Sequence, residues 1–222
     1  MSKLLFLAST NPGKLREFRL AGAETGVEIQ PVPTMRDLPP CIEDGSTFEA
    51  NASKKALHYA SYTRRAVFAE DSGICVDALG GAPGVLSARF SGQDATDERN
   101  NQKLISELRR HSEKPEAASH LRVRIAYPPF SGFPAHYACV IALAQGEQIL
   151  TVVEGRCDGI IIERPRGSGG FGYDPYFFYP PLNGTFAELS GNEKFHVSHR
   201  GIAFRKLLRS LLKNCEYGRA CF

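Results

Sequence analysis

Short apolar runs alternate with amphipathic stretches along most of the 222-residue chain. Runs of consecutive apolar residues predict buried strands, and apolar residues that recur three to four positions apart predict helices. We therefore expect strands over residues 3–8, 27–32, 66–69, 137–144, 148–154 and 158–162. We expect one helix from about Leu15 onward and others over 46–62, 96–110 and 198–213. Strands and helices that interleave in this way are typical of the α/β class.

Local signals set the ends of some of these elements. Residues 46–49 have the S-x-x-E form of a capping box, and Ser198 is a suitable N-cap for the last helix. Residues 112–135 are polar and then proline-rich, and they fit no regular element. The tail over 214–222 is expected to be frayed. Because no linker or repeat interrupts the pattern, we expect a single domain over residues 1–222.

Composition narrows the class of protein. Hydrophobic residues make up 42% and charged residues 23%, which are ordinary values for a globular domain with a sizeable core. The net charge of +3 is too small to favour a duplex nucleic acid or a membrane surface as partner. No run approaches the ~20 apolar residues of a membrane span. The six cysteines form no CxxC pair, which argues against a zinc site or disulfide framework and favours a reducing cytoplasm.

Residues 167–175 form a glycine-rich loop that contains two large aromatic side chains, Phe171 and Tyr173. Glycine lets a backbone approach a ligand closely. Aromatic side chains in such a loop can stack on a planar base, an interaction worth roughly 1–3 kcal/mol. The alternative is a turn whose rings cap the core, and this segment alone does not decide between the two.

Residues 9–14 leave a predicted strand and enter a predicted helix. Free backbone N–H groups and the helix dipole favour an anion at such a place, and Lys14 adds a positive charge. The segment is not a Walker A loop, because Leu15 follows the lysine and the first glycine of that motif is missing. A simple Pro-Gly turn with an exposed lysine is the competing interpretation.

Two pairs of acids are candidates for a metal site. Glu70 and Asp71 follow an apolar strand, at the end where ligand sites of α/β folds gather. Side chains alternate along a strand, so only one of the two should face a ligand, and alternation does not say which. Glu43 and Asp44 precede the second helix. Carboxylate oxygens without His or Cys suit Mg²⁺, although solvated turn acids explain each pair equally well.

A basic pair, His199 and Arg200, falls in the first turn of the last predicted helix. The helix dipole disfavours positive charge at that end. The pair therefore indicates an anion or a base carbonyl nearby, unless it lies on the surface of the helix.

Taken together, these segments resemble the non-canonical purine NTP pyrophosphatases, the inosine triphosphatase-like family. The resemblance rests on motifs in the family's order at residues 9–14, 43–48, 51–55, 70–73, 80–90, 169–175 and 198–201. It implies an elongated mixed β-sheet flanked by helices, with two lobes and the active cleft between them. It also implies a cytoplasmic homodimer that needs Mg²⁺.

The reaction implied is hydrolysis of ITP, dITP or XTP to the monophosphate and pyrophosphate, which cleanses the nucleotide pool. By position, Asp71 matches the general base and a metal ligand, and Glu43 matches a second metal ligand. Lys55 matches a further cation on the phosphate side, and Ser72 matches a substrate contact. The triphosphate loop would comprise Ser9, Thr10, Asn11, Pro12, Gly13 and Lys14.

The remaining matches concern the purine base. The base-stacking loop would comprise Phe171, Gly172, Tyr173 and Asp174. The groups that read the purine edge would be Lys194, His199 and Arg200. Donors such as His199 and Arg200 suit the 6-oxo group of hypoxanthine or xanthine. They would face the 6-amino donor of adenine unpaired, at a cost of ~1–3 kcal/mol.

Two segments depart from the family's pattern. The stretch over about 112–135 is longer than expected and indicates a loop insertion, and the tail over 214–222 extends beyond the expected end. Neither removes a motif. The insertion can alter the dimer surface or an edge of the cleft.

Other functions remain open at this stage. The enzyme can act on another modified nucleotide, or the chain can be a nucleotide sensor without turnover. A nucleic-acid-binding function rests only on a short basic run, Arg122, Arg124 and nearby His120, which is usually a solvated face.

Overall fold

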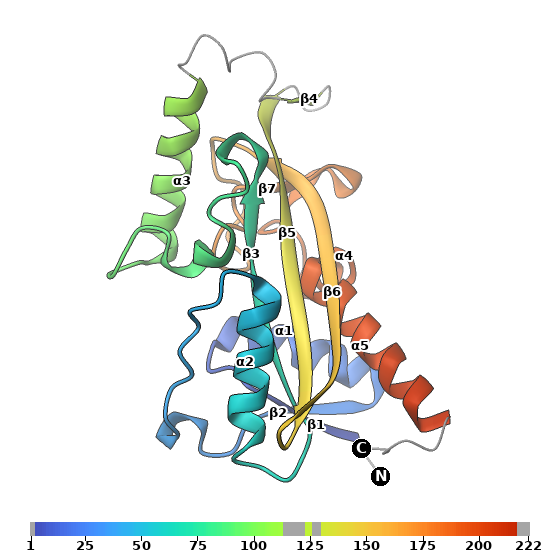
Figure 1. Cartoon of the computed structure of the whole chain (residues 1–222). Coiled ribbons are helices and arrows are strands. Elements are labelled where there is room, and N and C mark those ends of the chain that lie inside the picture. The colour runs from blue at the N-terminus through green and yellow to red at the C-terminus, as the bar shows by residue number, and fades with distance from the viewer. Residues whose placement is uncertain (1–2, 113–122, 126–129, 217–222) are drawn as a thin grey trace. The chain divides into compact units, whose positions relative to one another are not determined.

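The computed structural model describes residues 3–112, 123–125 and 130–216 (Figure 1). Its strands are β1 (Lys3–Leu7), β2 (Val27–Pro31), β3 (Val67–Val76), β4 (Val123–Ile125), β5 (Phe130–Gln145), β6 (Gln148–Ile161), β7 (Phe177–Tyr179) and β8 (Gly184–Thr185). Its α-helices are α1 (Pro12–Thr25), α2 (Phe48–Ala60), α3 (Asp97–Ser112), α4 (Gly191–Val197) and α5 (His199–Glu216).

The sheet is mixed, with strand order β2-β1-β3-β5-β6-β7-β8 and β4 paired with β5. β1 runs parallel to both β2 and β3, whereas β6–β7 and β7–β8 are antiparallel. The predicted α/β class with a mixed sheet is therefore confirmed. The chain divides into two compact units, and β3, β5 and β6 each contribute to both.

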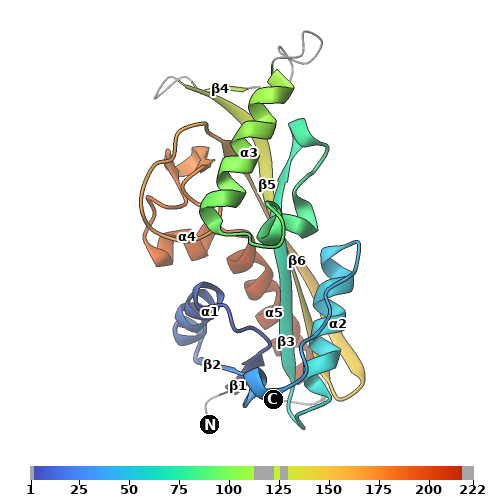
Figure 2. The same ribbon diagram turned by 90° about the vertical axis from the view of Figure 1, so that its left-hand side faces the viewer.

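Unit 1 comprises Met1–Asp71, Cys139–Arg156 and Phe195–Phe222. Its strands bury both faces, which explains their nearly continuous apolar sequences. Leu5, Leu7 and Phe68 belong to a core cluster with α1 and α5, whereas Phe6 and Val67 belong to a cluster with α2. Figure 2 shows α1 and α2 on opposite sides of β3.

Gly155 lets α5 approach β6 closely. A Cβ atom at this position would lie 2.1 Å from the backbone oxygen of His199 and 2.5 Å from the nitrogen of Ala203. The sequence pattern predicts a break between two strands here, and that prediction is wrong. β6 continues through Gly155, because the missing side chain makes room for a helix and does not end the strand.

Unit 2 comprises Ser72–Ala138 and Cys157–Lys194. Aromatic side chains form much of its core: the ring centroids of Tyr137 and Phe177 lie 4.7 Å apart, as do those of Phe177 and Phe186. The helix α3 adds Leu104 and Leu108, which are fully buried. This packing fixes α3 within the unit.

Other boundaries differ from the sequence expectation. The α2 helix is capped by Thr47 and not by Ser46, because the Thr47 side chain accepts a hydrogen bond from the backbone N–H of Ala50. Part of the stretch over 112–135 is strand: β4 pairs with the start of β5. Residues 113–122, 126–129 and 217–222 lie outside the described residues, and they include Arg122 and His120. The elements β7, β8 and α4 had no predicted counterpart.

Candidate active site

The acids at positions 70 and 71 lie inside β3, which runs on to Val76. Their predicted place at the end of a strand is therefore wrong. Alternation along the strand nevertheless places them on opposite faces of unit 1, as expected. Glu70 faces α1 and α5, and Asp71 faces α2, as their hydrogen-bond and ion-pair partners show.

Glu70 is buried in an ion-pair network. Its carboxylate contacts the ammonium of Lys14 and lies 3.7 Å from Nε of Arg200. Nη1 of Arg200 lies 3.3 Å from the Glu17 carboxylate. The Cys139 thiol donates a hydrogen bond to it at 3.6 Å. Burial opposes ionisation, but the positive charges of Lys14 and Arg200 outweigh it and hold the pKa of Glu70 well below its usual range.

Asp71 has a different environment. Its Oδ2 accepts a hydrogen bond of 2.9 Å from the side-chain amide of Asn51, a residue of α2 that is 1% exposed. The same Asn51 side chain accepts a 2.7 Å hydrogen bond from the Gly45 N–H. Burial, together with the charge of Glu70, raises the pKa of Asp71 although the Asn51 hydrogen bond lowers it. A carboxylate with a raised pKa is a better general base near neutral pH.

A hollow of about 530 Å³ in unit 1 gathers several of the predicted phosphate-binding residues. It is bordered by the loop before α1, by the segment after β2 and by α2. Its polar and charged lining residues are Ser9, Thr10, Asn11, Lys14, Arg36, Glu43 and Lys55.

The loop before α1 is ordered by its own side chains. The Asn11 carboxamide caps the helix by accepting from the Lys14 N–H at 3.0 Å, and Ser9 Oγ accepts from the Asn11 N–H at 3.2 Å. Pro12 occupies the first turn, where no acidic residue lies. The positive end of the helix dipole is therefore not offset locally, and it favours an anion in front of Gly13 and Lys14.

Lys55 adds a second cation to the hollow. Its Nζ lies 2.6 Å from the Glu43 carboxylate. Burial opposes the protonation of Lys55, but the negative charges of Glu43, Glu70 and Asp71 outweigh it and raise its pKa. Lys55 is therefore positively charged at neutral pH, and its direct partner is Glu43.

In unit 2, the predicted aromatic loop is organised around Asp174. Its Oδ2 accepts a 2.8 Å hydrogen bond from the Phe171 N–H and a 2.6 Å hydrogen bond from Lys194, both partners being at the same oxygen. Lys194 Nζ lies 4.7 Å from the centre of the Phe171 ring, in cation–π range. At Gly170 a Cβ atom would lie 2.0 Å from this carboxylate oxygen, so the turn admits only glycine.

Tyr173 and Ser72 are the other predicted residues of this unit. The Tyr173 hydroxyl donates to the Ser87 carbonyl at 2.8 Å, and the side chain is 4% exposed. Burial, with the charge of Asp97, raises its pKa. Tyr173 therefore anchors the loop, whereas the ring of Phe171 is only half-buried. Ser72 follows Asp71 on β3 and is half-buried.

His199 and Arg200 begin α5, as predicted. Ser198 caps the helix through a 3.2 Å hydrogen bond that its hydroxyl accepts from the Gly201 N–H. His199 is 1% and Arg200 6% exposed, which excludes a surface helix face. Arg200 is bound to Glu17 and Glu70, so its charge is already compensated inside unit 1.

The acidic residues of unit 1 fit Mg²⁺ only in part. Among the described residues no group of three or more His, Cys, Asp or Glu side chains is arranged to hold a metal ion. Mg²⁺ does not need such a cage, because it commonly takes one or two carboxylates and fills its shell with water and substrate phosphates. The two predicted ligands, Glu43 and Asp71, are both carboxylates of this unit, and two carboxylates are enough for such a site.

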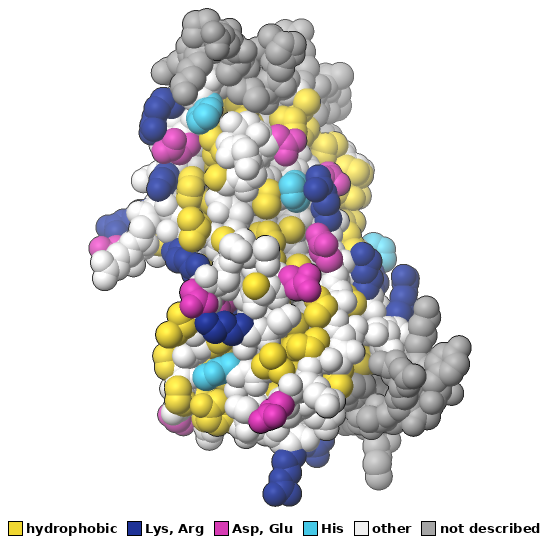
Figure 3. Space-filling view, in the orientation of Figure 1, with side chains coloured by type: hydrophobic (Ala, Val, Ile, Leu, Met, Phe, Trp, Pro, Cys, Tyr) yellow, Lys and Arg dark blue, Asp and Glu magenta, His cyan; other side chains and the backbone are white. Residues whose placement is uncertain are grey.

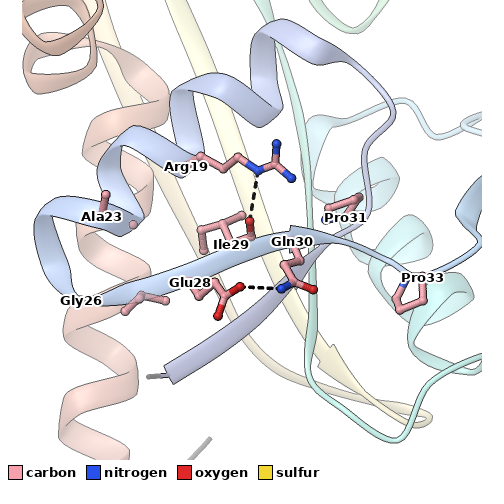
Figure 4. Close-up of a pocket in the computed structure, with 10 residues that line it drawn as sticks. Arg19, Ala23, Gly26, Glu28, Ile29, Gln30, Pro31 and Pro33 are labelled. Carbon is pink, nitrogen blue, oxygen red and sulfur yellow. Dashed lines mark hydrogen bonds between the residues drawn. The ribbon is translucent and has the colours of Figure 1, made fainter. Parts of the chain in front are cut away.

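A second hollow, of about 790 Å³, lies between α1 and β2 (Figure 4). The Arg19 side chain crosses it and donates to the Ile29 carbonyl at 3.3 Å. Its lining contains none of the predicted site residues. Its larger volume therefore does not make it the candidate site.

The surface charge and the hydropathy of the helices give little information about the kind of partner that this protein binds. Acidic and basic side chains intersperse among the described residues of the face shown in Figure 3, without one continuous basic field. Within the described part of the chain, no helix is both long and apolar enough to cross a membrane.

Sequence reasoning missed several residues around these sites. Asn51 was noted only as part of a motif, and Arg36, Glu17, Asp97 and Asn101 were not considered. For Asn51 a signal existed: it is a polar residue on the apolar face of a helix, beside Ala52 and one turn before Lys55. Such a residue needs a buried partner.

The helix N-terminus with Lys14, in a hollow that Lys55 also lines, suits a protein that binds an anionic ligand. Sequence comparison gives the particular family: the Ham1 family profile matches residues 5–210. The chain belongs to the Ham1 family, and the resemblance inferred from its motifs is confirmed.

Similar proteins extend over nearly the whole chain. The dITP/XTP pyrophosphatase of Geobacillus kaustophilus is 42% identical over 92% of this chain and 92% of its own length. The dITP/XTP pyrophosphatase of Lactococcus lactis is 42% identical over 95% of this chain and 97% of its own length.

Solved structures agree with this assignment. A HAM1 protein from Coxiella burnetii superposes with a TM-score of 0.78 at 36% identity, covering 95% of this chain and 99% of its own. The Staphylococcus aureus Ham1 protein gives 0.74 at 32% identity, covering 96% and 99%.

Proposed function

We propose that this protein is a nucleoside-triphosphate pyrophosphatase that hydrolyses dITP, ITP and XTP to the monophosphate and pyrophosphate. Family membership and the names of the relatives support the reaction class. The structural observation that carries the proposal is Asp71. It is a buried carboxylate with a raised pKa, fixed by Asn51, in the unit whose hollow brings together Lys14, Lys55 and the N-terminus of α1.

In the reaction, Asp71 orients a water molecule and accepts its proton. The water oxygen forms a bond to the α-phosphorus, the bond from that phosphorus to the bridging oxygen breaks, and pyrophosphate leaves. The loop from Ser9 to Lys14 binds phosphate oxygens through backbone N–H groups, hydroxyls and the Lys14 ammonium. Lys55 offsets the negative charge that shifts toward the leaving group.

Mg²⁺ is the cofactor we propose, held by carboxylate oxygens of Glu43 and Asp71. When bound, it would neutralise phosphate charge and act as a Lewis acid.

The purine base is proposed to stack on Phe171, in the loop formed with Gly172, Tyr173 and Asp174. Lys194, which is paired with Asp174, is proposed to contact the purine edge. His199 and Arg200 remain proposed readers of the 6-oxo group. Ser72 is proposed as a further substrate contact.

Product analysis tests this function. Purified protein with Mg²⁺ is given ITP, dITP, XTP, ATP and GTP, and pyrophosphate is distinguished from orthophosphate. We expect pyrophosphate with IMP, dIMP or XMP and little turnover of ATP. Orthophosphate as the main product would refute the proposed bond cleavage. Nucleotide binding without any product would favour a sensor.

A homodimer in the cytoplasm is also proposed. Sedimentation equilibrium of the purified chain distinguishes a dimer from a monomer of 24.4 kDa.

A further inference from the structure

Two residues of α3 hold the glycine at the centre of the aromatic loop. The carboxylate of Asp97 accepts a 2.6 Å hydrogen bond from the Gly172 N–H. The side-chain amide of Asn101 donates a 2.9 Å hydrogen bond to the Gly172 carbonyl. Asp97 and Asn101 are four residues apart and therefore lie on one face of α3. This face binds the peptide groups on both sides of Gly172, and we call the two hydrogen bonds the grip on Gly172.

Gly172 is the position where such a grip matters. Its φ of +62° lies in the left-handed region, and no atom would contact a Cβ there. Packing around its Cα therefore does not select this conformation, and glycine by itself samples many conformations. Hydrogen bonds on both sides of Gly172 fix its dihedral angles, and with them the ring of Phe171.

The helix that provides this grip is itself anchored. Asn101 is 7% exposed, and the next turns of α3 bury Leu104 and Leu108. Asn100 and Lys103 bind the segment after Ser87: Asn100 donates to the Ala88 carbonyl at 3.2 Å, and Lys103 to the Phe90 carbonyl at 2.7 Å. The Tyr173 hydroxyl binds Ser87 in the same segment.

We propose that Asp97 and Asn101 are positioning residues that preorganise the 171–174 loop and so set the affinity for the purine base. The inference rests on the proposed function, since it assigns the loop to the base. Without these two hydrogen bonds, the 171–174 loop would be mobile in the free protein and would lose that freedom when the base binds. This entropic cost would weaken the affinity for the nucleotide. The chemistry at Asp71 would be unaffected, because neither residue touches the reacting groups.

Asp97→Ala is the main test, because Asp97 is exposed and its loss does not disturb the core. We expect the KM for ITP to rise about tenfold, as befits one charge-assisted hydrogen bond, with kcat within about twofold. Asp97→Asn keeps an acceptor and should recover most of the affinity. Glu98→Gln removes the charge of the adjacent residue, which is also exposed, and its KM for ITP should match that of the wild type.

Competitive inhibition by tripolyphosphate separates positioning from general damage. It carries the phosphates without a base, so its Ki should be the same in Asp97→Ala and the wild type. If the Ki weakens as much as the KM for ITP, Asp97 supports the whole fold and the proposal is wrong. An unchanged KM for ITP would also overturn it.

A fluorescent reporter tests the loop without turnover. The chain has no tryptophan, so Phe171→Trp introduces a single one at the stacking position. IMP should quench its emission, and adding Asp97→Ala should raise the midpoint of quenching about tenfold. The same midpoint in both backgrounds would contradict the proposal. Failure of the wild type to release pyrophosphate from ITP would instead refute the proposed function, and the two failures are therefore distinct.

Discussion

The two faces of β3 in unit 1 carry neighbouring carboxyl groups with opposite pKa shifts. Toward α1 and α5, Glu70 meets Lys14 and Arg200, which keep it ionised. Toward α2, Asp71 meets a neutral amide from Asn51, and burial raises its pKa. Both side chains are buried, so the charge of the partners decides the direction. We infer that Glu70 holds the structure together, whereas Asp71 is reserved for chemistry.

Asp71→Asn gives the largest expected effect on activity. It keeps the shape of the side chain but removes the base, so kcat should fall about a thousandfold. Nucleotide affinity should stay within about tenfold of the wild type, because the phosphate and base contacts remain. The protein should be at least as stable as the wild type, since a neutral amide is easier to bury than a carboxylate. Initial rates and urea unfolding check these expectations, and near-normal activity would defeat the role of Asp71.

Glu70→Gln is the matched change on the other face. It leaves Lys14 and Arg200 without their shared buried anion, so the free energy of unfolding should fall by about 3 kcal/mol. Urea unfolding followed by circular dichroism gives this value. Equal stability of Glu70→Gln and Asp71→Asn would remove the distinction between the two faces.

Arg200→Ala tests whether Arg200, a member of the Glu70 ion-pair network, also contacts the substrate. If Arg200 reads the 6-oxo group, the preference for ITP over ATP should narrow about tenfold, through a lower kcat/KM for ITP. Its ion pairs with Glu17 and Glu70 predict a loss of stability as well. Rates for the two nucleotides that fall by the same factor would leave Arg200 with a structural role only.

The smallest of the expected effects is the change with pH in the free energy of unfolding that Glu70 contributes. Glu70 has a lower pKa in the folded protein than the ordinary value of 4.5, so it contributes stability above that value. This contribution disappears as the pH falls toward the folded pKa. The stability gap between the wild type and Glu70→Gln should therefore be constant from about pH 8 to 6 and narrow below about pH 5. A gap that widens on acidification would contradict the assignment.

Much of unit 1 could be predicted from its sequence, because apolar runs with regular spacing report burial directly. The strand that begins at Val27 and the opposite faces of Glu70 and Asp71 follow from local rules, whereas α1 begins at Pro12, three residues before the predicted start at about Leu15. Gly155 misled the prediction because one residue type serves both turns and close helix packing.

The site was less predictable, because its interactions join distant parts of the chain. Arg200 and Glu17 are 183 positions apart, and no local pattern pairs them. Alternation left open which acid is the base, and only the partners on each face distinguish Glu70 from Asp71. The grip of Asp97 and Asn101 on Gly172 spans more than 70 positions and was missed for the same reason.

Hydrolysis of ITP in ¹⁸O-labelled water tests the central claim most directly. Asp71 is proposed to direct water to the α-phosphorus, so the label should appear in IMP and be absent from pyrophosphate. The Glu70→Gln protein should place the label in the same product wherever it remains folded. Label in pyrophosphate would mean that water attacks a different phosphorus, and the proposed role of the Asp71 face would be wrong.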